Sequence, residues 1–169
     1  MLDCSYAARE TNNHPTSDNQ EFQSRGPCAC LAKDGSIKIQ PRHLNSLDFF
    51  DSNIASIFVS KIGWVYVSHD GRTVHVLTYD NGPDYFQEGL ARTIKNGKVG
   101  YIDHTLTEII PPIWDFAFPF NNGLAVVCQG CRSRAVGEHF EIYGGRWGYI
   151  NRLGKIIVPV KYKRESLSR

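Results

Sequence analysis

Short runs of β-forming residues alternate along this chain with pairs of turn residues. Three such runs cover residues 64–67, 73–77 and 90–94, which are rich in Val, Thr, Leu, Ile and aromatic side chains. The separating pairs tolerate the positive φ of tight hairpins, and they are Asp70-Gly71, Asn81-Gly82, Asn96-Gly97, Asn122-Gly123 and Gly144-Gly145. No window of about eleven or more residues carries a helical apolar stripe. The pattern therefore predicts an all-β fold of short antiparallel hairpins or meanders.

These runs belong to a sequence repeat. Gly89 opens a Gly-Leu-Ala triplet that returns 34 residues later at Gly123, and Tyr66 returns 35 residues later as Tyr101. The Tyr-Ile pair at Tyr101 returns at Tyr149 after 48 residues, which is one repeat plus an insertion of about 14 residues. Self-similarity at this period predicts a tandem array of β units that stack on one another.

The repeat divides the chain into three parts. Residues 1–27 are rich in Asn, Thr, Ser, Gln and charge, so we expect a flexible polar segment there. A β domain is expected over residues 28–163, and residues 164–169 form a basic tail. Within the β domain we expect a degenerate copy at about 30–60, copies at about 62–94, 97–128 and 145–162, and a hairpin insertion at about 129–144.

The last copy carries the most specific motif. It reads Trp147-Gly148-Tyr149-Ile150-Asn151, followed by a Gly154-Lys155 turn and a strand that ends in Pro159-x-x-Tyr162. This resembles the WG-repeat family, whose Trp-Gly-Tyr-Ile-Asp strand is followed by a Gly-Lys turn and a Pro-x-x-Tyr ending. The preceding copy is similar but has Val99 in place of the Trp, and Trp64 is followed by Val rather than Gly.

Other family elements recur in register. Phe-x-x-Gly-Leu-Ala stands at Phe86 and again at Phe120, and the resemblance covers about residues 30–162. The resemblance implies repeated β-hairpin or meander units, found widely in bacterial proteins, with no general catalytic activity. It therefore implies a fold and a binding role, and it carries over no active-site residue.

The repeated aromatic and glycine residues are expected to be structural. One unit cannot bury its apolar face alone, so its Trp and Tyr stack on the neighbouring unit. The two glycines of the motif permit a close backbone approach or a bulge. The residues concerned are Trp64, Tyr66, Gly100, Tyr101, Trp147, Gly148 and Tyr149. An aromatic cage for a ligand is the alternative.

Composition limits the function classes. A net charge of +2 on 169 residues does not indicate nucleic-acid binding. No apolar run is long enough to span a membrane, and no signal peptide is evident, so a cytoplasmic protein with reduced thiols is expected. The sequence matches no phosphate loop, nucleophile elbow, dinucleotide fingerprint or His-Glu-x-x-His helix, so no catalytic residue is assigned.

Two constellations leave a metal site open. Four thiolates could hold zinc tetrahedrally, from Cys28, Cys30, Cys128 and Cys131, although free or core cysteines are the alternative and no other cofactor is expected. His69 and His104 occupy equivalent positions in adjacent repeats, where they could bind metal or sense pH, or simply be solvated. Together they support a rival hypothesis, a metal- or small-ligand-binding enzyme.

The insertion is the candidate recognition element. Because it interrupts a regular array and is charged, we expect it to contact a protein partner through Arg132, Arg134, Glu138, His139 and Glu141. The favoured hypothesis is a non-catalytic protein-interaction module, and a toxin-neutralising immunity protein is a narrower hypothesis within this class. Self-association through an edge strand remains open.

Overall fold

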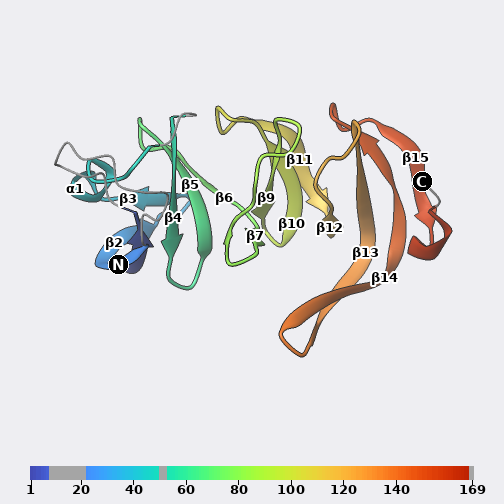
Figure 1. Ribbon diagram of the computed structural model, residues 1–169, viewed down its shortest axis with the longest axis horizontal. Coiled ribbons are helices and arrows are strands. Elements are labelled where there is room, and N and C mark those ends of the chain that lie inside the picture. The colour runs from blue at the N-terminus through green and yellow to red at the C-terminus, as the bar shows by residue number, and fades with distance from the viewer. Residues whose placement is uncertain (8–21, 50–52, 168–169) are drawn as a thin grey trace. The chain divides into compact units, whose positions relative to one another are not determined.

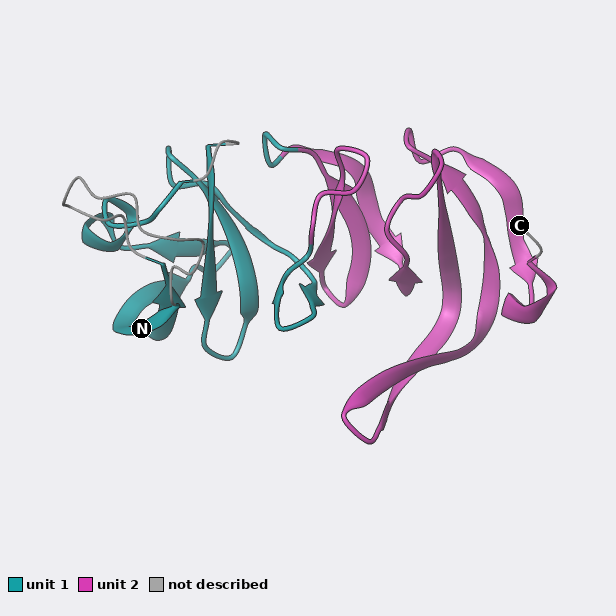
Figure 2. Ribbon diagram, viewed as in Figure 1, with its two compact units in different colours: residues 1–84, 104–106 teal, residues 85–103, 107–169 magenta. Residues whose placement is uncertain are grey.

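The computed structural model describes residues 1–7, 22–49 and 53–167 and divides the chain into two compact units (Figures 1 and 2). Unit 1 comprises residues 1–84 and 104–106, and unit 2 comprises residues 85–103 and 107–169. In the described part of the chain, the only helical elements are the one-turn helix α1 (Pro41–Leu44) and the 3-10 turn η1 (Arg164–Ser166). Neither is long and apolar enough to cross a membrane. The all-β prediction is confirmed.

Unit 1 is built on a six-stranded antiparallel sheet with the order β3-β2-β1-β4-β5-β6. The strands are β1 (Leu2–Tyr6), β2 (Gln23–Leu31), β3 (Ile37–Ile39), β4 (Ile54–Val59), β5 (Gly63–Ser68) and β6 (Thr73–His75). A separate ribbon pairs β7 (Thr78–Tyr79) with β8 (Gly82–Pro83). Ile57, Val65 and Val67 lie fully buried in the core of this unit, and β-branched residues of this kind also favour the strand conformation of β4 and β5.

The N-terminal residues belong to this sheet. The prediction of a flexible segment over residues 1–27 is wrong at both ends, because β1 pairs with β2 and with β4. Cys4 and Tyr6 are buried, and the Tyr6 hydroxyl lies 2.9 Å from Nδ1 of the buried His43. The alternation of Leu2, Cys4 and Tyr6 is a strand signal that the polar average of the segment concealed. Residues 8–21 lie outside the described residues.

Unit 2 contains two antiparallel sheets. The first has the order β11-β10-β9, with strands β9 (Ala91–Lys95), β10 (Lys98–Ile102) and β11 (Glu108–Trp114). The second has the order β12-β13-β14-β15, with strands β12 (Phe116–Ala117), β13 (Leu124–Val136), β14 (His139–Asn151) and β15 (Ile156–Tyr162). The turn between β9 and β10 has Asn96 and Gly97 at positive φ, as a tight hairpin requires.

A three-stranded meander recurs along the chain as β4-β5-β6, β9-β10-β11 and β13-β14-β15. Its middle strand carries the repeated tyrosine each time, at Tyr66, Tyr101 and Tyr149. The prediction of a repeated β fold is therefore confirmed. Counting the degenerate copy expected at about residues 30–60 as the first repeat, we call β9-β10-β11 the third repeat and β13-β14-β15 the fourth repeat.

Candidate functional site

The glycine of the repeated motif lies where two strands approach closely. A Cβ atom on Gly148 would overlap the carbonyl oxygen of Val158, and one on Gly100 would overlap that of Ile110. Both glycines coincide with a register shift between the middle strand and the strand that follows it. The motif therefore encodes a bulged, tightly packed strand pair and no reactive group.

The third repeat has a covered face. Tyr101 is fully buried, its hydroxyl donates to the carbonyl oxygen of Phe118 at 2.6 Å, and its ring packs edge-on to Phe120 at 4.7 Å. Nη1 of Arg92 donates to the carbonyl oxygen of Ala117 at 3.1 Å. Residues 116–120, which we call the covering segment, therefore seal this face with apolar side chains and with two backbone carbonyl groups.

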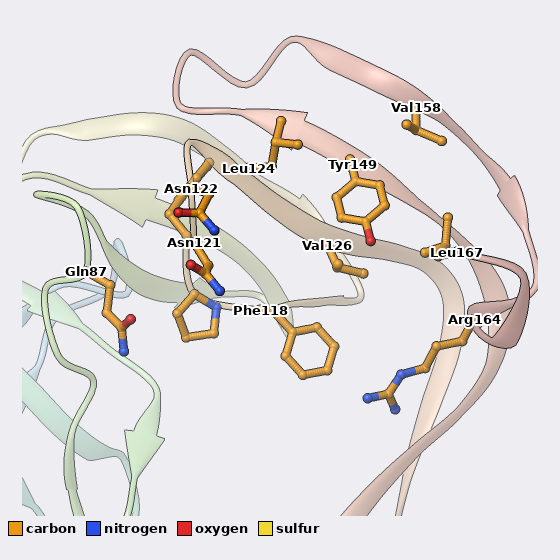
Figure 3. Close-up of a pocket in the computed structure, with 12 residues that line it drawn as sticks. Gln87, Phe118, Asn121, Asn122, Leu124, Val126, Tyr149, Val158, Arg164 and Leu167 are labelled. Atoms are coloured by element: carbon orange, nitrogen blue, oxygen red, sulfur yellow. The ribbon is translucent and has the colours of Figure 1, made fainter. Parts of the chain in front are cut away.

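The fourth repeat exposes the corresponding face. Strand register pairs Tyr101 with Arg92 and Ile110, and it pairs Tyr149 with Val126 and Val158 in the same way. Leu90, Arg92, Tyr101 and Ile110 are buried. Their equivalents in the fourth repeat, Leu124, Val126, Tyr149 and Val158, are only partly buried. These four side chains line a groove of about 790 Å³ (Figure 3).

The other walls of the groove come from the covering segment and from η1. Phe118 lies on one side and Arg164 on the other, and Asn121 and Asn122 add polar groups at one end (Figure 3). The guanidinium carbon of Arg164 lies 5.0 Å from the Phe118 ring centroid and 5.3 Å from that of Trp147. No acidic side chain among the described residues pairs with Arg164. The groove is thus mainly apolar, with an available cation at its rim.

The predicted insertion forms a two-stranded arm, residues 131–144, at the distal end of β13 and β14 (Figure 1). Register runs from Cys131 opposite Gly144 to Val136 opposite His139. Neither β12 nor β15 pairs with these residues, because their partners lie within residues 127–128 and 147–150. The arm therefore exposes both of its faces and both of its edges.

The arm's chemistry differs from the prediction. Arg134 and Glu141 form an ion pair with each other at 2.6 Å, and Arg134 also lies over the Tyr143 ring at 5.1 Å. Arg132, Glu138 and His139 are exposed. The sequence interpretation omitted Phe140, whose side chain is 77% exposed, and Val136 and Tyr143, which are also exposed. In the sequence, apolar residues on a hairpin indicate a buried core. These residues are exposed because no third strand among the described residues pairs with the arm.

The four-cysteine zinc site does not form in this structure. Cys28 is bonded to Cys4, and Cys128 is bonded to Cys131, so three of the four proposed ligands are in disulfides. Cys30 is free and exposed. The Cys4–Cys28 disulfide depends on the pairing of β1 with β2, which the sequence interpretation missed; its Cα–Cα distance of 5.8 Å is ordinary. The expectation of reduced thiols is wrong for these two pairs.

The pairing of His69 with His104 stays a prediction, and no larger histidine cluster forms in the described residues. The His69 ring stacks on Phe49 with 3.7 Å between centroids. Across the described ranges, no group of three or more His, Cys, Asp and Glu side chains is placed to hold a metal ion. Burial lowers the pKa of His75 and of His43, which the sequence interpretation did not single out, so both rings favour the neutral form.

Comparison with known proteins finds one family. Residues 100–130 and 147–164 match a model described as "WG containing repeat", and these segments hold the motif strands of the third and fourth repeats. No curated protein and no solved structure gives a significant match. The resemblance inferred from the motif residues is confirmed in these two segments.

Proposed function

Starting from the fact that this chain carries WG-containing repeats, we propose that it is a non-catalytic protein-interaction module whose arm contacts a protein partner. The observation that carries this proposal is the exposure of Phe140, at 77%, on a two-stranded arm. A large aromatic side chain held on a paired strand loses little conformational entropy on binding, and such residues are frequent anchors of protein interfaces.

The surroundings of Phe140 support the same role. Val136 and Tyr143 add exposed apolar surface on the arm, while Arg132 and Glu138 supply charges that can select a partner. Because Arg134 and Glu141 already neutralise each other, we assign them to the rigidity of the arm rather than to contact. The proposal thus shifts the contact surface from the charged residues to the apolar ones.

The rival proposal, an enzyme that uses the cysteines and histidines, has less support. Three of its four cysteines are in disulfides, and His69 stacks on a phenylalanine ring. A toxin-neutralising, immunity-type protein would be one kind of interaction module, and a toxin would then be the partner. No observation favours that narrower role over another protein partner.

The compartment is a separate proposal. A cytoplasmic location stays a prediction, and two disulfides are more typical of an oxidising compartment. Thiol labelling before and after reduction, performed on protein extracted with rapid alkylation, distinguishes the two. Four protected cysteines indicate an oxidising compartment, and five labelled cysteines indicate the cytoplasm.

Quantitative affinity capture tests the interaction module. Tagged wild-type chain and its Phe140→Ser variant are used to capture proteins from a lysate of the source cell, and bound proteins are quantified by mass spectrometry. We expect a stoichiometric partner whose recovery falls about tenfold or more with the variant, since anchors of this kind contribute about 2 kcal/mol or more. Leu153→Ser is the matched control, because Leu153 is 83% exposed but lies outside the arm. Equal recovery with all three chains would contradict the proposal.

A further inference from the structure

The third repeat has an aromatic covering segment that the open face of the fourth repeat lacks. Phe118 and Phe120 of the covering segment contact Tyr101 in the third repeat, one through its backbone and the other through its ring. Counting 48 residues on, the spacing that relates Tyr101 to Tyr149, gives Ser166 and Ser168. The residues that follow the fourth repeat therefore supply no aromatic side chains at the equivalent positions.

The hydrogen bonds of the repeated tyrosine hydroxyl also distinguish the fourth repeat from the others. Tyr66 donates to the carbonyl oxygen of Asp84 at 2.6 Å, and Tyr101 donates to that of Phe118 at 2.6 Å. These acceptors lie 18 and 17 residues after their tyrosines. Within the described residues Tyr149 has no such acceptor, and its hydroxyl points into the groove (Figure 3). Among the described residues, the Tyr149 hydroxyl of the fourth repeat is thus a free donor, whereas the hydroxyls of Tyr66 and Tyr101 each donate to a backbone carbonyl group of a later segment.

Charge distinguishes the two faces further. Beside the covering segment of the third repeat, Asp115 forms an ion pair with Lys98. The residues 48 positions later are Lys163 and Arg146, so the fourth repeat has two cations where the third has an ion pair. Arg164 adds a third cation at the rim of the groove. An occupant that carries a carboxylate is therefore favoured over a neutral or basic one.

We propose that this groove binds an extended segment of a partner protein in which phenylalanine residues follow an acidic residue. A backbone carbonyl of the segment accepts the Tyr149 hydroxyl, an aromatic side chain packs on the Tyr149 ring between Leu124 and Val126, and the carboxylate pairs with Arg164. The segment covers the Tyr149 ring as residues 116–120 cover Tyr101 on the third repeat, and η1 of the chain itself forms the wall beside it. This site is separate from the arm and does not depend on the role proposed for Phe140.

The chain's own sequence provides the probe. A fluorescein-labelled peptide Asp-Phe-Ala-Phe-Pro-Phe, which copies residues 115–120, is titrated with the full chain and followed by fluorescence anisotropy. We expect saturable binding to one site. Tyr149→Phe should weaken it about three- to tenfold, since one hydrogen bond is lost, and Leu124→Glu should weaken it more than tenfold. Ile113→Glu is the control, because Ile113 is exposed on β11 and does not line the groove.

A charge exchange tests the pose at an exposed side chain. Arg164 is exposed, so Arg164→Glu should fold normally, weaken the acidic peptide and strengthen binding of Lys-Phe-Ala-Phe-Pro-Phe. Absence of saturable binding by wild type, or equal loss with Ile113→Glu, would overturn the proposal. Sedimentation of the chain alone is the final check: a dimer that Leu124→Glu dissociates would assign the groove to a second copy and would also overturn it.

Discussion

The third and fourth repeats share a meander, a tyrosine at the centre of the middle strand and a glycine pressed against the next strand. They differ in what lies on the face that bears the tyrosine. The third repeat covers Tyr101 with residues 116–120, whereas the fourth repeat leaves Tyr149 lining a groove. Repeat units stabilise themselves by burying their apolar faces against neighbouring chain. The same residue therefore has a structural role in one repeat and is available for binding in the next.

The largest expected effect comes from uncovering the third repeat. Phe120 is 1% exposed and packs on Tyr101, so Phe120→Ala should lower the free energy of unfolding by about 3–5 kcal/mol. Urea denaturation followed by tryptophan fluorescence measures the change. Phe140→Ala is the control, and because Phe140 is exposed its effect should stay within about 0.5 kcal/mol. Similar effects of the two variants would show that the third repeat is not covered as described.

A second pair of variants tests what the repeats share. Gly100→Ala and Gly148→Ala should each destabilise the chain by about 2–3 kcal/mol, because the added methyl group would overlap backbone atoms of the adjacent strand. Thermal or urea unfolding gives both values. Gly82→Ala serves as the control, since its Cβ would make an ordinary 3.7 Å contact. If Gly148→Ala were tolerated, the fourth repeat would not share the strand packing of the third.

The tyrosine hydroxyls should separate the repeats. Tyr101→Phe leaves the Phe118 carbonyl without its donor and should cost about 1–2 kcal/mol of unfolding free energy. Tyr149→Phe removes no intramolecular hydrogen bond among the described residues and should change stability by less than about 0.5 kcal/mol. Equal costs, measured by urea denaturation, would mean that Tyr149 is already satisfied within the chain.

The smallest expected effect concerns Asp115. A hydrogen bond from Lys98 and another from the Gly130 N–H hold the pKa of Asp115 below its usual value. Because the folded-state pKa is lowered, this stabilisation is complete above the unfolded-state value of about 3.9 and is lost as pH falls through the folded-state pKa. Asp115→Asn should cost less than about 1 kcal/mol at pH 7 and reduce the loss of stability in acid. An unchanged acid limb would contradict this assignment.

Much of the fold could be predicted from the sequence because its signals are local. Turn pairs such as Asn96-Gly97 and the spacing of the tyrosines indicated the hairpins and the repeat. The N-terminal strand was missed, since the alternation of Cys4 and Tyr6 is brief and its partner strand begins only at Gln23. The Cys4–Cys28 disulfide was missed for the same reason.

The candidate sites were harder to predict because each depends on a strand or segment that does not cover it. The insertion was recognised from its length, but Phe140 was not, since exposure is set by the lack of a third strand beside the arm. Tyr149 was expected to be structural because the residues that flank it match those that flank Tyr101. The motif alone does not reveal that the segment covering one repeat has no aromatic counterpart on the next.

The most direct test of this difference is the solvent accessibility of the two tyrosines. The full chain is labelled with 3-fluorotyrosine, resonances are assigned with Tyr101→Phe and Tyr149→Phe, and fluorine NMR relaxation is measured with a soluble gadolinium chelate. We predict strong relaxation enhancement at Tyr149, which the Asp-Phe-Ala-Phe-Pro-Phe peptide suppresses, and little enhancement at Tyr101. Equal protection of both tyrosines without peptide would contradict the open face of the fourth repeat.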